Sequence, residues 1–268
     1  YKPDHNPPHK TKDGYTLVWN DEFNAKGKPD ASSWQYEHGF VRNEELQWYK
    51  EDNATCENGV LLIKGIRDTI ANNQYDSNSK DWRKNRQYAG YSSASINTAA
   101  HHAWLYGRFE VRARIDTAKG SWPAIWTLGT QGEWPKNGEI DIMEFYRVKD
   151  EPSILANMAW GTSQQYEAKW NTHISPLSQF TNQDSNWVKK FHLWRMDWTK
   201  DSIKLYLDTT LMNTMALSKT INADGSNPFT KPQYLLLNLA IGGNGGHPSH
   251  TPLPIKYEVD YVRVYQKK

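Results

Sequence analysis

The chain has 268 residues, and its 32 lysines and arginines nearly balance its 30 aspartates and glutamates. This balance gives no case for a nucleic acid or an anionic membrane as a partner. Cys56 is the single cysteine, which excludes an internal disulfide or a cysteine metal cluster. No apolar run approaches the roughly 20 residues that a membrane-spanning helix needs.

Residues 1–14 carry no apolar signal-peptide core and are expected to form an N-terminal linker or tail. From residue 15 onward, short apolar or alternating runs bounded by turn residues predict strands. They fall at 15–19, 60–64, 91–98, 104–115, 154–160, 191–198, 203–207, 234–241 and 257–265. Residues 68–90 are expected to be a long polar loop. Without a long helical period or a repeat, the pattern predicts one all-β sandwich domain over residues 15–268.

The segment 138–145, Gly-Glu-Ile-Asp-Ile-Met-Glu-Phe, places three acids in an alternating apolar run. In a regular strand Glu139 and Asp141 share one face, whereas Glu144, five positions after Glu139, points to the other. One extra residue, a β-bulge with Met143 as the insertion, turns Glu144 back onto the acidic face. We therefore expect that deletion of Met143 leaves a strand but removes Glu144 from reach.

Two interpretations of this acidic strand compete. It is either a solvated face whose acids pair with nearby lysine or arginine, or a carboxylate site for glycoside hydrolysis. Retaining glycosidases need two carboxyl groups about 5–5.5 Å apart, one as nucleophile and one as acid and base. The apolar alternation and the tryptophans just upstream favour the second interpretation.

Aromatic residues are abundant, with 13 Trp and 15 Tyr. Core packing accounts for roughly two thirds of them, and the others suit stacking against the flat faces of sugar rings. Other chemistries find less support. The adjacent His101 and His102 point apart on a strand, no G-x-S-x-G nucleophile turn occurs, and no helix start with Lys-Ser/Thr follows the glycines at 242–246.

At this point the residues resemble a known family. Segment 139–144 is similar to the E-x-D-x-x-E signature of glycoside hydrolase family 16, in the bulged form of the laminarinases. Further similar segments follow in the family's order and cover roughly residues 15–266. They lie at 20–23, 45–49, 91–98, 106–110, 122–126, 237–243 and 259–265.

The resemblance implies a jelly-roll β-sandwich of two antiparallel sheets whose concave face forms an open substrate cleft. In it Glu139 is the nucleophile, Glu144 the acid/base and Asp141 the residue that assists the pair. The resemblance also implies substrate-binding positions at Asn43, Glu45, Trp122, Trp126, Trp134 and Trp160. No cofactor is required, but many members bind a structural calcium ion, for which Glu22, Gly59 and Asp260 fall on matching positions.

The implied function is that of an endo-acting retaining β-glucanase, which hydrolyses β-1,3- or mixed β-1,3/1,4-glucans by double displacement. An endo-galactanase for algal galactans and a non-catalytic glycan-binding module stay open as alternatives. The expected partner is the polysaccharide, and the protein is expected to be a monomer that is secreted, periplasmic or on the cell surface.

Three departures from the family's pattern fall near the cleft. Ala159 stands where laminarinases usually have a histidine, Glu44 stands where an asparagine is usual, and the loop at 68–90 is longer. They leave the linkage preference open.

Overall fold

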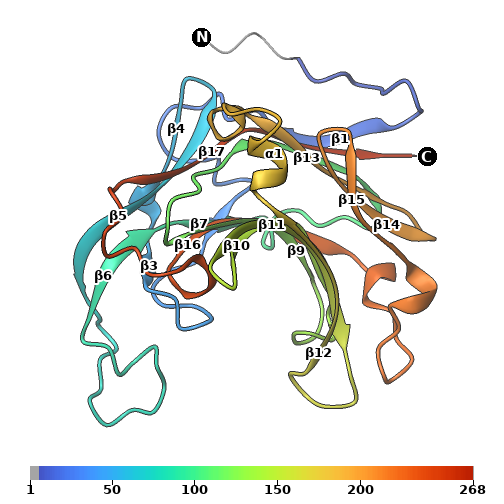
Figure 1. The fold of residues 1–268 in the computed structure, drawn as a ribbon. Helices are drawn as coiled ribbons and strands as arrows, with labels where there is room; N and C mark the ends of the chain where they lie inside the picture. Colours follow the sequence, from blue (N-terminus) through green and yellow to red (C-terminus); the bar gives the residue numbers. More distant parts are fainter. Residues whose placement is uncertain (1–5, 268) are drawn as a thin grey trace.

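The computed structural model describes residues 6–267 and is built almost entirely of β-strands (Figure 1). The strands are β1 Thr16–Asp21, β2 Gln35–Tyr36, β3 Gln47–Tyr49, β4 Ala54–Glu57, β5 Val60–Ala71, β6 Tyr88–Ser93, β7 Ser95–Asn97, β8 Gly107–Arg114, β9 Ser121–Gly129, β10 Glu139–Val148, β11 Glu151–Gly161, β12 Ala168–Pro176, β13 His192–Trp198, β14 Ser202–Leu207, β15 Thr210–Ala216, β16 Gln233–Ile241 and β17 Ile255–Gln266. The helical segments are α1 Ser178–Thr181 and the 3₁₀ turns η1 Glu51–Asn53, η2 Trp187–Lys189, η3 Leu217–Lys219, η4 Pro228–Thr230 and η5 Gly243–Gly245.

The strands form two sheets that pack face to face. One sheet has the order β15-β14-β13-β8-β17-β5-β6-β3, with β1 on β17 and β4 on β5. The other has the order β12-β11-β10-β9-β16-β7-β2 and curves beneath the first in Figure 1. This arrangement confirms the predicted β-sandwich. It departs from purely antiparallel pairing in one place among the described residues, because β3 and β6 run parallel.

The core lies between the sheets because alternate residues of each strand point inward. Strand β13 is buried at every second position, with Trp194, Met196 and Trp198 inside. From the other sheet, β10 contributes Ile140 and Phe145 to the same core cluster. The β4–β5 hairpin follows the Asn58-Gly59 turn, whose two residues have φ of 54° and 72°, as an Asn-Gly hairpin requires.

One loop is shorter than expected, and part of the N-terminal segment contacts the domain. The loop expected at 68–90 is shorter, because β5 continues to Ala71 and β6 begins at Tyr88. The predicted tail 1–14 contacts the domain where it is described. Asp13 accepts hydrogen bonds from Arg108 at 2.8 and 3.1 Å, while residues 1–5 lie outside the described part. None of the helices described is long and apolar enough to cross a membrane.

The β-bulge in β10 is confirmed by the pairing register. Asp141 lies opposite Asn157 of β11 and Trp126 of β9, and Glu144 lies opposite Leu155 and Ala124. Residues 142 and 143 therefore stand where each neighbouring strand has a single residue. Both side chains point into the core, so Glu144 stays on the face of Glu139 and Asp141.

The same register shows that the expected effect of deleting Met143 is wrong. Removing one of the two bulged residues restores regular alternation from Asp141 to Glu144 and leaves the partners of Glu144 unchanged. The bulge accommodates the extra residue and keeps Glu144 on the acidic face despite the odd spacing.

Deletion of Met143 should therefore keep Glu144 on the concave face. Because Met143 is fully buried, we expect a loss of stability of about 2–5 kcal/mol. Chemical denaturation measures the stability, and hydrolytic activity reports the position of Glu144. An activity as low as that of Glu144→Gln, in a deletion variant that still unfolds cooperatively, would contradict this prediction.

Candidate active site

A cleft of about 690 Å³ runs over the concave face of the seven-stranded sheet. Its lining comes from β9, β10, β11, β12 and β16 and from three loops, which lie before β3, between β9 and β10, and after β16. The lining residues are Arg42, Asn43, Glu45, Trp122, Ala124, Trp126, Leu128, Trp134, Glu139, Glu144, Tyr146, Asn157, Trp170, Thr172, Asn238, Gly243 and Asn244. Five adjacent strands span about 19 Å at a spacing of about 4.8 Å, so the cleft is an extended groove.

The two predicted catalytic glutamates each accept a hydrogen bond from a tryptophan. The indole Nε1 of Trp134 donates to Glu139 Oε2 at 2.5 Å, and that of Trp122 donates to Glu144 Oε1 at 3.0 Å. The second oxygen of Glu144 accepts from Asn157 Nδ2 at 3.1 Å. These rigid donors fix the orientation of both carboxyl groups.

Burial of three carboxyl groups together changes how they hold protons. The pKa of Asp141 lies well above its usual range because of burial and the neighbouring charges of Glu139 and Glu144. Burial, together with the charge of Glu139, raises the pKa of Glu144 to about 7. Burial also raises the pKa of Glu139, but hydrogen bonds from Asp141 and Trp134 act in the opposite direction.

These shifts assign different states to the three groups. Asp141 holds its proton more tightly than a free aspartate and donates to Glu139, whose proton affinity that bond lowers, whereas Glu144 holds its proton through part of the neutral pH range. Two glutamates with separated protonation states can serve as a nucleophile and as a general acid. The structure thus gives the predicted trio one shared site.

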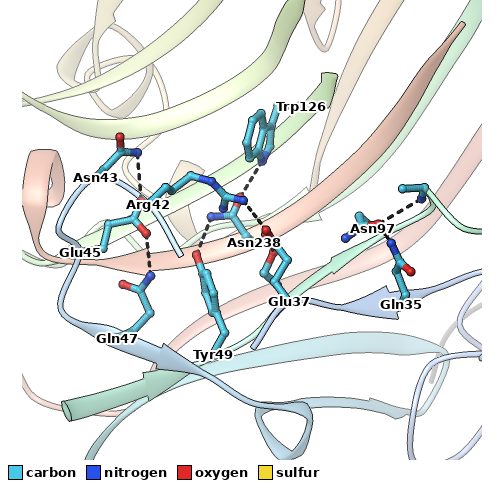
Figure 2. Close-up of polar contacts among 12 residues, drawn as sticks. Gln35, Glu37, Arg42, Asn43, Glu45, Gln47, Tyr49, Asn97, Trp126 and Asn238 are labelled. Atoms are coloured by element: carbon cyan, nitrogen blue, oxygen red, sulfur yellow. Dashed lines mark hydrogen bonds and ion pairs between the residues drawn. The ribbon is translucent and has the colours of Figure 1, made fainter. Parts of the chain in front are cut away.

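A buried polar network forms the wall of the cleft on the β16 side (Figure 2). The guanidinium of Arg42 pairs with Glu37 and lies 5.1 Å from the centroid of the Trp126 ring. The indole of Trp126 donates to Asn238 Oδ1 at 2.8 Å, and Asn238 donates to the Tyr49 hydroxyl at 2.9 Å. Trp126 is therefore held from two sides.

The two polar residues expected near the sugar belong to the same wall. Asn43 Nδ2 donates to Glu45 Oε1 at 3.3 Å, and Gln47 Nε2 donates to Glu45 Oε2 at 2.7 Å. Burial raises the pKa of Glu45. The backbone of this loop is strained, because Asn43 and Glu44 have φ of 56° and 49°, in the left-handed region that non-glycine residues rarely adopt.

The long loop at 72–87, which projects at the lower left of Figure 1 in teal, holds this strained segment in place. Its Arg86 donates from Nη1 to the carbonyl oxygen of Glu45 at 2.6 Å and from Nη2 to that of Glu44 at 2.8 Å. The guanidinium lies 5.0 Å from the ring centroid of Phe40. We call this contact the Arg86 brace. It connects a loop outside the cleft to residues that line it.

The structure places one predicted cleft residue elsewhere. Trp160 follows Ala159 by one position and therefore points to the opposite face of β11, where it belongs to the hydrophobic core. The expectation that it contacts substrate is corrected for this reason. Asn43, Glu45, Trp122, Trp126 and Trp134 do line the cleft, and their contacts with substrate stay a prediction.

Several cleft residues were missed in the sequence, notably Arg42, Asn157, Trp170 and Asn238. For Asn157 a signal existed in the sequence. It precedes Ala159 by two positions, so both residues lie on the face of β11 that borders the cleft, whereas Trp160 lies on the opposite face. Arg42 and Trp170 had no such signal, because each reaches the site through a fold contact distant in sequence.

The expected calcium-binding residues lie on β17 or next to the strands that pair with it. Glu22 follows β1, Gly59 is in the β4–β5 turn, and Asp260 is in β17, which pairs with β1 and β5. Glu22 accepts from Arg263 at 2.9 and 3.1 Å, and Asp260 accepts from Arg112 at 2.6 Å. No cluster of three His, Cys, Asp or Glu side chains suited to a metal occurs in residues 6–267. Calcium at Glu22, Gly59 and Asp260, a set of oxygen ligands that suits this ion, stays a prediction.

Comparisons with known proteins identify the family of the chain. The Glycosyl hydrolases family 16 model matches residues 44–263. The chain is 33% identical to the beta-glucanase of Rhodothermus marinus over 94% of this chain and 85% of that relative. The solved structure of SCLam, a non-specific endo-beta-1,3(4)-glucanase, superposes with a TM-score of 0.76 at 34% identity, covering 100% of this chain and 95% of that chain.

A further solved structure superposes with a TM-score of 0.88 at 35% identity, over 98% of this chain and 94% of that chain. Its description concerns endo-acting O-glycanases that prominent members of the human gut microbiota express to initiate mucin breakdown. The family match covers most of the chain, and the chain belongs to glycosyl hydrolase family 16.

Proposed function

We propose that this family 16 hydrolase cleaves β-1,3- and mixed β-1,3/1,4-glucans at internal linkages. The observation that carries the proposal is the pair of glutamates on one bulged strand, each hydrogen-bonded to a tryptophan, in the middle of an extended groove. The cleft lining continues on both sides of β10, so a polymer bound along it exposes an internal bond to Glu139 and Glu144. The glucanase relatives support the choice of substrate.

In the first step the ionised Glu139 attacks the anomeric carbon while Glu144 gives its proton to the departing glycosidic oxygen. In the second step Glu144, now ionised, takes a proton from a water molecule whose oxygen attacks the anomeric carbon. The bond between that carbon and the Glu139 oxygen breaks, which releases the sugar and restores the Glu139 carboxylate. Asp141 donates a hydrogen bond to Glu139, so it lowers the affinity of Glu139 for protons and prepares it as a nucleophile.

Retention of configuration is supported by the position of Asp141. Glu139 and Glu144 stand on the same face of β10 with the small carboxyl group of Asp141 between them, and Asp141 affects the proton affinity of both. Two glutamates that flank one small side chain on the same strand face fit the short separation of retaining enzymes better than the about 6.5–9.5 Å of inverting ones. Because polymeric glucans do not cross membranes, we also infer that the enzyme works outside the cytoplasm.

A second candidate substrate is favoured by the higher TM-score of 0.88 with the structure described in connection with O-glycanases, against 0.76 for SCLam. Four lining residues, Asn43, Asn157, Asn238 and Asn244, carry amides, which suit the acetamido groups of amino sugars. A sulfated galactan fits less well, because Arg42, the basic side chain of the described lining, is already paired with Glu37.

A substrate panel tests the proposal. Wild-type enzyme should release reducing ends from laminarin or barley β-glucan, more than from agar or a mucin O-glycan. Glu139→Gln should lower kcat by at least about a thousandfold with an unchanged melting temperature, because the nucleophile is lost. Preferential cleavage of the mucin glycan would establish the second candidate, and near-normal activity of Glu139→Gln would disprove the assigned nucleophile.

The pKa of Glu144 predicts the alkaline limit of activity. Only the protonated form acts as the acid, so kcat/KM should fall about tenfold per pH unit above roughly pH 7. Asn157 donates to the carboxylate and favours the ionised form. Asn157→Ala should therefore raise this pKa and move the alkaline limb to higher pH. A limb that stays in place or moves to lower pH would contradict the role of Asn157.

The Arg86 brace predicts an effect on substrate binding from outside the cleft. Arg86→Ala removes two charge-assisted hydrogen bonds to the Asn43–Glu45 segment and should raise KM by about tenfold, with a smaller change in kcat. Arg83→Ala is the matched control, since Arg83 in the same loop is exposed and pairs with Asp81. Equal KM values for both variants would show that the brace does not position the cleft loop.

A further inference from the structure

Two exposed tryptophans and a tyrosine gather at the β12 end of the cleft. Trp134 is 36% exposed, Trp170 is 46% exposed and Tyr166 is 59% exposed. The rings of Trp134 and Trp170 lie 6.4 Å apart between centroids at an angle of 49°. Large aromatic side chains left in water next to a substrate groove add little to the core and mark an interaction site.

The strand register explains why Trp170 reaches this place. Glu139 of β10 lies opposite Ala159 of β11, and Ala159 lies opposite Trp170 of β12. Residues directly opposite each other in a sheet share a face, so the Trp170 side chain stands on the face of Glu139. The methyl side chain of Ala159 is buried between them and leaves room for the indoles of Trp170 and Trp134.

Trp134 joins this end of the cleft to a second hollow of about 650 Å³. Trp134 lines both spaces, and the second is lined further by Tyr166 and by polar groups of the loops around β11 and β12. The charged side chains of the second hollow interact with other residues of its lining. Lys136 pairs with Asp224 at 2.6 Å, and Glu133 accepts a hydrogen bond from the Tyr166 hydroxyl at 3.2 Å.

These contacts indicate the chemistry of the ligand. Glu133 and Asp224 outnumber Lys136 in the second hollow, and the neighbouring cleft is lined by the carboxyl groups of Glu45, Glu139 and Glu144. An anionic group would therefore be repelled, whereas the aromatic faces suit the C–H face of a neutral sugar ring. Hydroxyl groups of such a ring can bond to the amides and carboxylates of the rim.

We propose that Trp170 and Trp134 form an aromatic subsite for a neutral sugar unit of the bound polymer, and that the polymer continues from it into the hollow beside Tyr166. This inference rests on the proposed function, because it assumes that a glycan chain occupies the cleft. It adds a distal binding position to the catalytic centre and links it through Trp134 to the nucleophile.

Hydrolysis of oligosaccharides of increasing length tests the subsite. Trp170→Ala should lower kcat/KM by about tenfold on long oligosaccharides, mainly through KM, and by less on the shortest cleaved one. Ile174→Ala is the matched control, because Ile174 lies four residues further on β12 and is 45% exposed but does not line the cleft. Neither variant should change the melting temperature. An equal loss at every length, or the same loss in Ile174→Ala, would overturn the subsite.

A binding measurement separates failure of the subsite from failure of the proposed glucan substrate. The inactive Glu139→Gln protein, with and without Trp170→Ala, is run in native gels that contain laminarin, barley β-glucan or mucin. Reduced retardation of the double variant by any polymer supports the subsite, even where that polymer is not a glucan. Equal retardation of both proteins by the polymer that binds, or retardation by none, would refute it.

Discussion

The structure depends on the crowding of three carboxyl groups on one strand, of which Asp141 is buried and Glu139 and Glu144 are half-buried. Water stabilises ionised carboxylates, so withdrawing one of them fully and two of them partly from solvent is unfavourable unless protons or donors compensate. Here Asp141 keeps its proton, Glu139 accepts from Asp141 and Trp134, and Glu144 accepts from Trp122 and Asn157. The energetic cost of this arrangement is what separates the proton affinities and makes the group chemically useful.

The tryptophans of the concave face have two roles at once. Trp122 and Trp126 are each only 8% exposed, although both stand on the concave face of β9 and line the cleft. Their indole N–H groups are bound to Glu144 and Asn238. A rigid aromatic ring fixed by a hydrogen bond loses little entropy when a sugar binds. The same side chains therefore build the sheet face and prepare it for a ligand.

Parts of the chain outside the cleft maintain its geometry. The loop before β3 contains two residues with left-handed backbone conformations, which are unfavourable without support. The Arg86 brace and the bond from the Ile241 amide to Gln47 Oε1, at 2.8 Å, provide that support.

The sequence by itself determined the strand pattern and the acidic cluster. Residues alternate between the two faces of a strand, so Glu139 and Glu144, five positions apart, can share a face only if a bulge inserts one extra residue. The sequence also led to the family, through short segments in a fixed order.

Residues whose role depends on distant neighbours could not be identified from the sequence. Trp160 was assigned to the cleft, although it points into the core, and Arg42, Asn157 and Trp170 were missed. The consequence of the bulge was also misjudged, since only the pairing with β9 and β11 shows which residues lie opposite one another. Cross-strand register, burial and the state of each proton arise from contacts between segments far apart in the chain, and for that reason only the tertiary structure decided them.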